Sequence, residues 1–174
     1  MSDTLRIMEL VDSLAQVSDL EGACRVLTRS PALGRPFHQA LCGLVDDKAA
    51  FSEIARYNMQ GLPHDFQNLR VWADAPLSRS LVSGEPRLFH RNQFSSLHPD
   101  IRFDWRLSAA STLLVVPVPE RGVPYGAVLL FSEEYFETIE TGERHRDLVL
   151  GSVKLQLRAH EWRNGLASTR SRAS

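Results

Sequence analysis

Side chains that could bind a small molecule are concentrated in residues 100–110, a stretch with neither helical nor strand periodicity. The stretch carries two aromatic rings, whose large faces suit planar ligands. The Arg102 guanidinium can bind an anionic group, and the Asp100 carboxylate can accept a ring N–H or a hydroxyl. The simpler interpretation is a core-filling aromatic set beside a solvated loop with local ion pairs. We predict a ligand site made of Tyr57, Trp72, Asp100, Arg102, Phe103 and Trp105.

Patterns typical of catalysis or of metal binding are not found in the sequence. The six histidines show no H-x-H, H-x-x-x-H or H-E-x-x-H spacing, so we expect no zinc site. Cys24 and Cys42 fall on a predicted terminal helix and on the first predicted strand, where we expect buried, unreactive thiols. The ten glycines form no phosphate-binding loop, and no nucleophile elbow is present. We therefore expect no catalytic residue, no metal and no cofactor.

Length and charge limit the number of domains and the classes of partner. The chain has 174 residues, which suits one domain, and 20 Lys and Arg balance 21 Asp and Glu for a formal charge of −1. This balance excludes a chain-wide basic surface for nucleic acid or anionic lipid. The first residues lack the basic and apolar regions of a secretory signal, and no stretch approaches the ~20 apolar residues of a membrane span. We expect a cytoplasmic protein without membrane contact.

The candidate site must be positioned by a mixture of helices and strands. Apolar residues at helical spacing predict two helices at the start of the chain, separated by a capping break at Ser18 and Asp19. A helix in the middle of the chain is expected to end at Gly84, and a long helix closes the sequence. The predicted helices span 5–17, 20 to the residue before Pro31, 65–72, 76–82 and 141–163, with a helical turn at 92–98.

Alternating and β-branched runs predict two antiparallel hairpins and one short strand. The first hairpin spans 37–58, and strict alternation within its second strand places Phe51 and Tyr57 on the same face. The second hairpin spans 111–131, with Pro117 expected at a bulge or where pairing ends. The short strand is predicted at 87–90, and the hairpin turns at 46–48 and 121–123.

The first and last predicted helices have apolar residues over a wider part of their surface than is needed to pack against the sheet alone. In the last helix one face carries residues spaced seven apart, while Val149, Val153 and Leu157 lie nearly opposite. The sheet can cover only one of these faces, so we predict that a second copy of the chain covers the other in a four-helix bundle. The predicted dimer interface consists of Leu10, Leu14, Leu148, Leu155 and Trp162.

The order of elements and two local motifs resemble the GAF domain, a small-molecule sensor fold. The first motif is the helix over 75–83 that ends in Gly84-Glu85-Pro86 before a short strand. The second is the strand pair 114–118 and 125–131, with a proline in the first strand and a Gly-x-apolar step in the second. The resemblance covers residues 5–163. It implies an α+β fold: an antiparallel sheet of five or six strands, with terminal helices on one face and a ligand pocket on the other.

The lead-in Trp72-Ala73-Asp74-Ala75-Pro76 is similar to the sensor domains at the N-terminus of bacterial LuxR-type transcriptional regulators. This resemblance implies a sensor domain over 1–165 followed by a basic tail or linker over 166–174. It also implies an unidentified small-molecule ligand, a homodimer, and DNA contact only through a helix-turn-helix domain that this sequence does not contain.

Two other interpretations remain open at this point. One is a redox enzyme with the same fold, of the free methionine sulfoxide reductase type, which requires reactive cysteines in loops over the pocket. The other is a dimerisation module that binds no ligand. Bilin attachment would also need a loop cysteine, and the aspartates of the cyclic-nucleotide-binding members cannot be placed.

Overall fold

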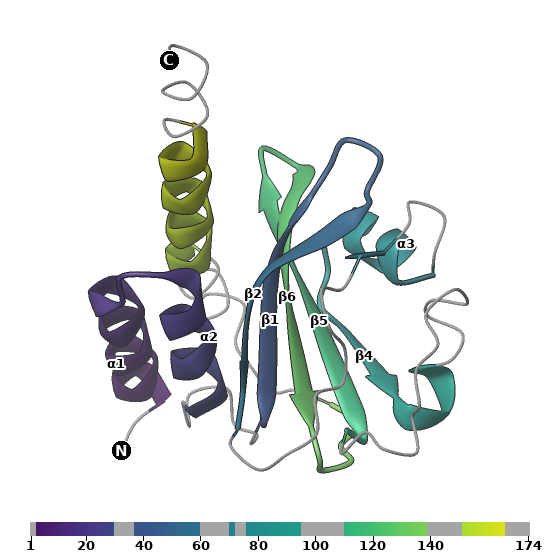
Figure 1. The fold of residues 1–174 in the computed structure, drawn as a ribbon. Helices are drawn as coiled ribbons and strands as arrows, with labels where there is room; N and C mark the ends of the chain where they lie inside the picture. The colour runs from purple at the N-terminus through teal and green to yellow at the C-terminus, as the bar shows by residue number, and fades with distance from the viewer. Residues whose placement is uncertain are drawn as a thin grey trace.

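Figure 1 shows the chain in a computed structural model that describes residues 3–29, 37–59, 70–71, 76–94, 110–138 and 151–165. The helices are α1 (Asp3–Gln16), α2 (Leu20–Arg29), α3 (Pro76–Val82), the short 3-10 helix η2 (Arg91–Gln93) and a helix over residues 151–165. The strands are β1 (Gln39–Val45), β2 (Phe51–Asn58), β3 (Arg70–Val71), β4 (Arg87–His90), β5 (Thr112–Glu120) and β6 (Val123–Ser132).

The strands form one six-stranded sheet in the order β3-β2-β1-β6-β5-β4, and every pair is antiparallel. The two predicted hairpins are β1–β2 and β5–β6, and they meet where β1 pairs with β6 at the centre of the sheet. The shortest strands, β3 and β4, form the two edges. The sequence-based prediction of an antiparallel sheet of five or six strands is confirmed.

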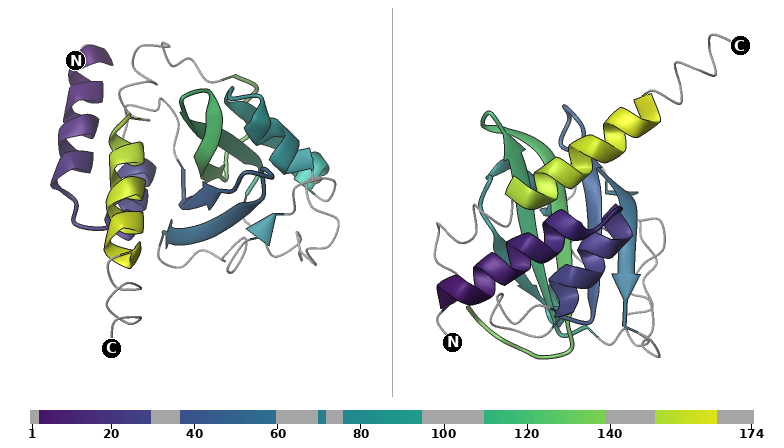
Figure 2. Two further views of the ribbon diagram at one scale, coloured as in Figure 1. Left: turned by 90° about the horizontal axis from the view of Figure 1, so that it is seen from above. Right: turned by 90° about the vertical axis from the view of Figure 1, so that its left-hand side faces the viewer.

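Helices cover the two faces of the sheet unequally (Figures 1 and 2). We call α1, α2 and residues 151–165 the helical layer; they lie on one face of the sheet, as expected for the terminal helices, with α1 outermost. Alternate residues of the central strands divide between the two cores: Cys42 and Leu130 face the helical layer, whereas Leu41 and Phe131 face the side that α3 covers. Among the described residues no helix has the length and apolar character needed to cross a membrane.

Local capping and turn residues explain where several elements begin and end. The Asp19 carboxylate accepts a hydrogen bond from Gly22 N at 2.8 Å, which caps the start of α2. Gly84 ends α3 with a φ of +70°, a conformation that costs glycine little. Arg121 and Gly122 both have positive φ, which gives the two-residue turn that suits the twist of the β5–β6 hairpin. Pro117 lies beyond the last residue pair between β4 and β5, so its missing N–H costs no bond with β4.

A bulge in β2 corrects the predicted face of Tyr57. In the β1–β2 ladder Cys42 pairs with Ala55 and Gly43 pairs with Glu53, so Ile54 is an extra residue. An extra residue reverses the alternation of side chains beyond it. Phe51 consequently lies in the core under α3, whereas Tyr57 packs against the core under the helical layer. The expectation that these two side chains share a face is wrong.

Residues 70–71 correct a second prediction, the helix over 65–72. They form β3, which pairs antiparallel with β2 through Phe51↔Val71 and Ser52↔Arg70. The free edge of β2 offers backbone partners, and this tertiary pairing overrides the local helical pattern. The rest of that predicted helix, the predicted elements within 95–109 and 139–150, and the tail at 166–174 lie outside the described residues.

The helix over 151–165 docks on both the sheet and α1. Val153 and Leu157 are buried, and a Cβ placed on Gly126 of β6 would lie 2.7 Å from Leu157 Cδ1, so the absent side chain makes room for the helix. The Gln156 side chain donates to the backbone carbonyls of Leu14 at 3.1 Å and Val17 at 3.2 Å. Because the last carbonyls of a helix have no partner within it, these bonds cap the end of α1.

The predicted dimer-interface residues separate into two groups. Leu10 and Leu14 are 2% and 0% exposed and belong to the apolar core on the side of the helical layer, so their placement at a surface between two chains is wrong. The apolar side of α1 is used within the chain because α2 and the helix over 151–165 pack around it. Leu155 and Trp162 are 68% and 70% exposed, and Leu148 lies outside the described residues.

Candidate functional site

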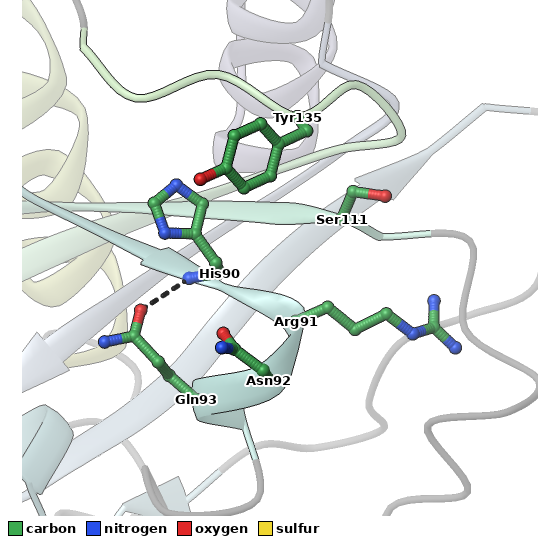
Figure 3. A pocket seen from close by; sticks show the side chains of 6 residues that line it. All are labelled: His90, Arg91, Asn92, Gln93, Ser111 and Tyr135. Atoms are coloured by element: carbon green, nitrogen blue, oxygen red, sulfur yellow. Dashed lines mark hydrogen bonds between the residues drawn. The ribbon is translucent and has the colours of Figure 1, made fainter.

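A polar cleft of about 420 Å³ opens at the end of the edge strand β4 (Figure 3). Three segments far apart in the sequence contribute to it: the end of β4 with η2, the residue before β5, and the loop after β6. Among the described residues, its lining is His90, Arg91, Asn92, Gln93, Ser111 and Tyr135.

Backbone geometry at the end of β4 explains why these side chains face a common space. The β4–β5 ladder ends with the pair His90↔Thr112, and Arg91 N then donates to Ser111 O at 3.0 Å. The chain turns at once into η2, where the Gln93 side-chain oxygen accepts the His90 backbone N–H at 2.9 Å (Figure 3). Four consecutive polar residues therefore follow one tight turn at the sheet edge.

The His90 and Tyr135 rings form one wall of the cleft. Their centroids are 4.5 Å apart at an interplanar angle of 30°, and Figure 3 shows the two rings beside each other. The His90 Nε2 atom lies 3.0 Å from the Phe136 carbonyl oxygen, and because a carbonyl only accepts, Nε2 carries the proton. In the neutral imidazole Nδ1 is then an acceptor.

Arg91 supplies the positive charge of the cleft. Its Nη1 donates to the Ala110 carbonyl at 3.1 Å, which fixes part of the guanidinium against the backbone. Among the described lining residues there is no carboxylate and no thiol. In the part of the chain that the structure describes, no three His, Cys, Asp or Glu side chains are grouped to hold a metal ion. The cleft can therefore bind an anionic or hydrogen-bonding group, but these residues offer no nucleophile paired with a base.

Of the sequence-predicted ligand residues only Tyr57 is described, and it does not line this cleft. Trp72 and the predicted loop residues Asp100, Arg102, Phe103 and Trp105 lie outside the described residues. Tyr57 lies under α2, where its ring is 5.6 Å from the guanidinium carbons of both Arg25 and Arg29.

Sequence reasoning missed the cleft residues, and only one signal pointed to them. The four residues from His90 to Gln93 are all polar and directly follow a short strand. Ser111 and Tyr135 join them only through the pairing of β4 with β5 and of β5 with β6. The sequence does not reveal these long-range pairings residue by residue.

The two cysteines meet in the core. Cys24 on α2 and Cys42 on β1 are both fully buried, as predicted, and the Cys24 thiol donates to Cys42 Sγ at 3.3 Å. The pKa of the Cys24 thiol is raised well above its ordinary value. The hydrogen bond with Cys42 is the largest cause, and burial is the second. Sequence reasoning did not predict this contact, because it depends on how α2 packs across β1.

Native cysteine alkylation is expected to be at least a hundredfold slower than alkylation of the unfolded chain. Only the thiolate reacts, and both burial and the raised pKa of Cys24 suppress it. Intact-mass spectrometry during iodoacetamide treatment at pH 8, with and without urea, measures both rates. Complete labelling within minutes under native conditions would contradict the assignment of inert thiols.

Comparison with known proteins places the fold. No family model matches the chain, and no curated protein sequence matches it. Solved structures do match. The GAF domain of a Coxiella burnetii phosphoenolpyruvate-protein phosphotransferase is 17% identical with a TM-score of 0.58, over 95% of this chain and 96% of that one. The corresponding Acinetobacter GAF domain is 12% identical with a TM-score of 0.61, over 92% and 97%. This chain has the GAF fold.

A third match extends the comparison to a ligand-bound GAF domain. The phycocyanobilin-bound GAF domain of a cyanobacterial phytochrome is 15% identical with a TM-score of 0.57, over 90% of this chain and 94% of that one.

The two motifs that carry the sequence resemblance can be located in this fold. Gly84-Glu85-Pro86 connects α3 to β4, the strand that ends at the cleft. Gly126, from the second motif, lies in β6 beneath Leu157.

Proposed function

We propose that this chain is a non-catalytic, small-molecule-sensing domain and the signal-input module of a bacterial transcriptional regulator of the LuxR type. The observation that carries the proposal is the polar cleft at the end of β4 in a GAF fold. It combines one guanidinium with hydrogen-bonding groups and an imidazole–phenol wall, which suits recognition of a small polar ligand. DNA contact belongs to a helix-turn-helix domain that this sequence does not contain, and the module acts in the cytoplasm.

A short physical path supports the proposed signalling. The cleft borders β6, because Ser111 N donates to Ser132 O at 2.7 Å and the Thr112 hydroxyl donates to Glu134 O at 2.8 Å. At its other end β6 contacts the helix over 151–165, where Leu157 lies over Gly126 and the Tyr125 hydroxyl donates to Glu161. Suppose that β5 and β6 can adopt two arrangements and that the ligand binds one of them more tightly. Ligand binding would then favour the placement of the helix over 151–165 that goes with that arrangement.

The proposed regulator works as a homodimer. The exposed Leu155 and Trp162 lie on the helix over 151–165, and Leu5 and Met8 are exposed on α1. Exposed apolar side chains on neighbouring helices are typical of a surface that another chain covers. Ligand binding on the sheet edge and pairing through the helical layer would then use different surfaces of the domain.

A redox enzyme of the free methionine sulfoxide reductase type is the alternative that one observation favours. The two thiols are 3.3 Å apart, as a disulfide-forming pair would require. Both thiols lie in the core beneath α2, however, and none lines the described part of the polar cleft. A substrate bound in that cleft would not reach them, which supports the non-catalytic proposal.

Ligand binding is expected to raise the melting temperature by roughly 5–10 °C at a hundredfold excess over the dissociation constant. We would screen aromatic acids, nucleotides and acyl-lactones by thermal denaturation and by intrinsic tryptophan fluorescence. Arg91→Gln should abolish the stabilisation by the best compound, whereas Arg121→Gln, on the exposed hairpin turn, should preserve it. A screen without any shift in either signal would favour the dimerisation module that binds no ligand.

A further inference from the structure

A second cleft, of about 300 Å³, is lined by residues of α1 and α2, two neighbouring helices of the helical layer. It lies away from the sheet edge that forms the polar cleft, and the two clefts share no described residue. Three of its seven described lining residues are arginines. The lining consists of Arg6, Glu9, Leu10, Ser13, Arg25, Val26 and Arg29.

Tyr57 holds two of these arginines beside each other. The Arg29 Nη2 atom donates to the Tyr57 hydroxyl at 3.0 Å, and the guanidinium carbons of Arg25 and Arg29 each lie 5.6 Å from the centre of the Tyr57 ring. Arg25 also forms a long, exposed ion pair with Glu21 at 3.8 Å, which contributes little. Each guanidinium has five N–H donors, so most of their donors remain available for a ligand.

Arg6 enters the same cleft from α1 with an unusual feature. Its Nε atom is buried and has no hydrogen-bond partner among the residues that the structure describes. A buried N–H donor on a charged group is costly to leave without an acceptor, and such groups are rare unless water or a ligand satisfies them. The three arginines therefore line one small cleft, and a bound ligand toward which the Arg6 side chain turns would supply the missing acceptor.

We propose that this cleft binds the phosphoryl group of a small phosphate monoester. The three guanidiniums of the lining outnumber the Glu9 carboxylate there and the Glu21 carboxylate beside Arg25, so the cleft has a net positive charge that favours a phosphate group. Guanidinium forks bind phosphate oxygens in pairs, and a turn of the Arg6 side chain toward the cleft would add its Nε donor. The volume is at the lower end of the ~300–1,000 Å³ typical of small-molecule sites, so the organic part of the ester is small.

Glu9 and Ser13 define the organic part further. A carboxylate beside three arginines disfavours a bare anion but accepts hydrogen bonds from hydroxyl groups. The Ser13 hydroxyl donates to the Glu9 carbonyl at 2.7 Å and keeps its oxygen lone pairs as acceptors. The site therefore favours a hydroxylated ester over inorganic phosphate. Glycerol 3-phosphate is the simplest soluble probe of this chemistry, and phosphatidic acid presents the same phosphate monoester on a lipid surface.

Isothermal titration calorimetry of the full chain with glycerol 3-phosphate, at constant ionic strength, tests the proposal directly. We expect saturable binding that is stronger than binding of inorganic phosphate or sulfate, and none for glycerol. Arg6→Gln and Arg29→Gln should each weaken the affinity about tenfold or more, since each removes a charge-assisted hydrogen bond. Arg158→Gln, on the helix over 151–165, is the matched control and should leave the affinity unchanged. Vesicles with and without phosphatidic acid distinguish a lipid source from a soluble one.

Nitrogen-15 NMR of the arginine side chains gives a readout that does not depend on any variant folding. The Arg6 Nε–Hε resonance should move downfield on addition of the ester, because the proton gains an acceptor. Absence of saturable binding of any phosphate monoester, soluble or on vesicles, would overturn the proposal. So would binding that Arg6→Gln and Arg29→Gln leave unchanged, or an Arg6 resonance that does not respond.

Discussion

Gly43→Ala is expected to lower the free energy of unfolding by about 3 kcal/mol, equivalent to a fall of roughly 6–12 °C in melting temperature. A Cβ at this position of β1 would lie 2.5 Å from the Phe51 ring and closer still to the Ser52 carbonyl oxygen. Phe51 is fully buried and the carbonyl belongs to the adjacent strand, so neither can move aside cheaply. Urea denaturation followed by circular dichroism measures the change.

Gly151→Ala is the matched control for this substitution. Nothing lies within 4 Å of a Cβ at Gly151, which is exposed on the last helix. Alanine there should raise stability by about 0.5–1 kcal/mol, because glycine is the weaker helix former. If the two variants have the same stability, or if Gly43→Ala equals the wild type, the close approach of β1 and β2 at this position is refuted.

The double variant Leu155→Glu with Trp162→Glu is expected to convert the proposed dimer into a monomer. Burial of the exposed Trp162 indole in the interface is worth about 2–3 kcal/mol per chain, and the substitution removes it. The two new carboxylates of each chain would also repel those of the other chain across a surface without water. The association constant should fall at least a hundredfold. Light scattering with size-exclusion chromatography reports the molar mass of both forms.

Val82→Glu is the control that shows whether a loss of dimer comes from the surface of the last helix or only from the added negative charge. Val82 is 59% exposed at the end of α3, on the opposite face of the sheet from the helical layer. This variant should keep the mass of the wild type, and circular dichroism should show that the double variant is folded. A wild-type chain that is monomeric at micromolar concentrations, or a double variant that stays dimeric, contradicts the proposed dimer.

Local patterns predicted most of the fold because each can be recognised within a few residues. The sequence predicted that Asp19 caps the start of α2, that Gly84 ends α3 and that Arg121 and Gly122 form the hairpin turn. The structure confirms all three. The order of helices and hairpins then carried the resemblance to the GAF fold, which the solved structures support.

The candidate sites were less predictable, because they depend on contacts between distant residues. One extra residue in β2 moved Tyr57 to the opposite face of the sheet from Phe51. The polar cleft unites His90, Ser111 and Tyr135 only after β4, β5 and β6 have paired. Likewise, the burial of Leu14 depends on where α1 docks, and amphipathic periodicity alone does not say which neighbour covers an apolar side.

The Gln156 amide that caps α1 fixes how far the helix over 151–165 lies along α1. A helix that slides by one turn moves about 5.4 Å and presents a residue four positions away. At the place of Gln156 it would then present Ser152 or His160, neither of which has a primary amide with two N–H donors. A displacement of one turn would therefore lose both hydrogen bonds, so the Gln156 amide holds the first and last helices in the single register that the structure shows.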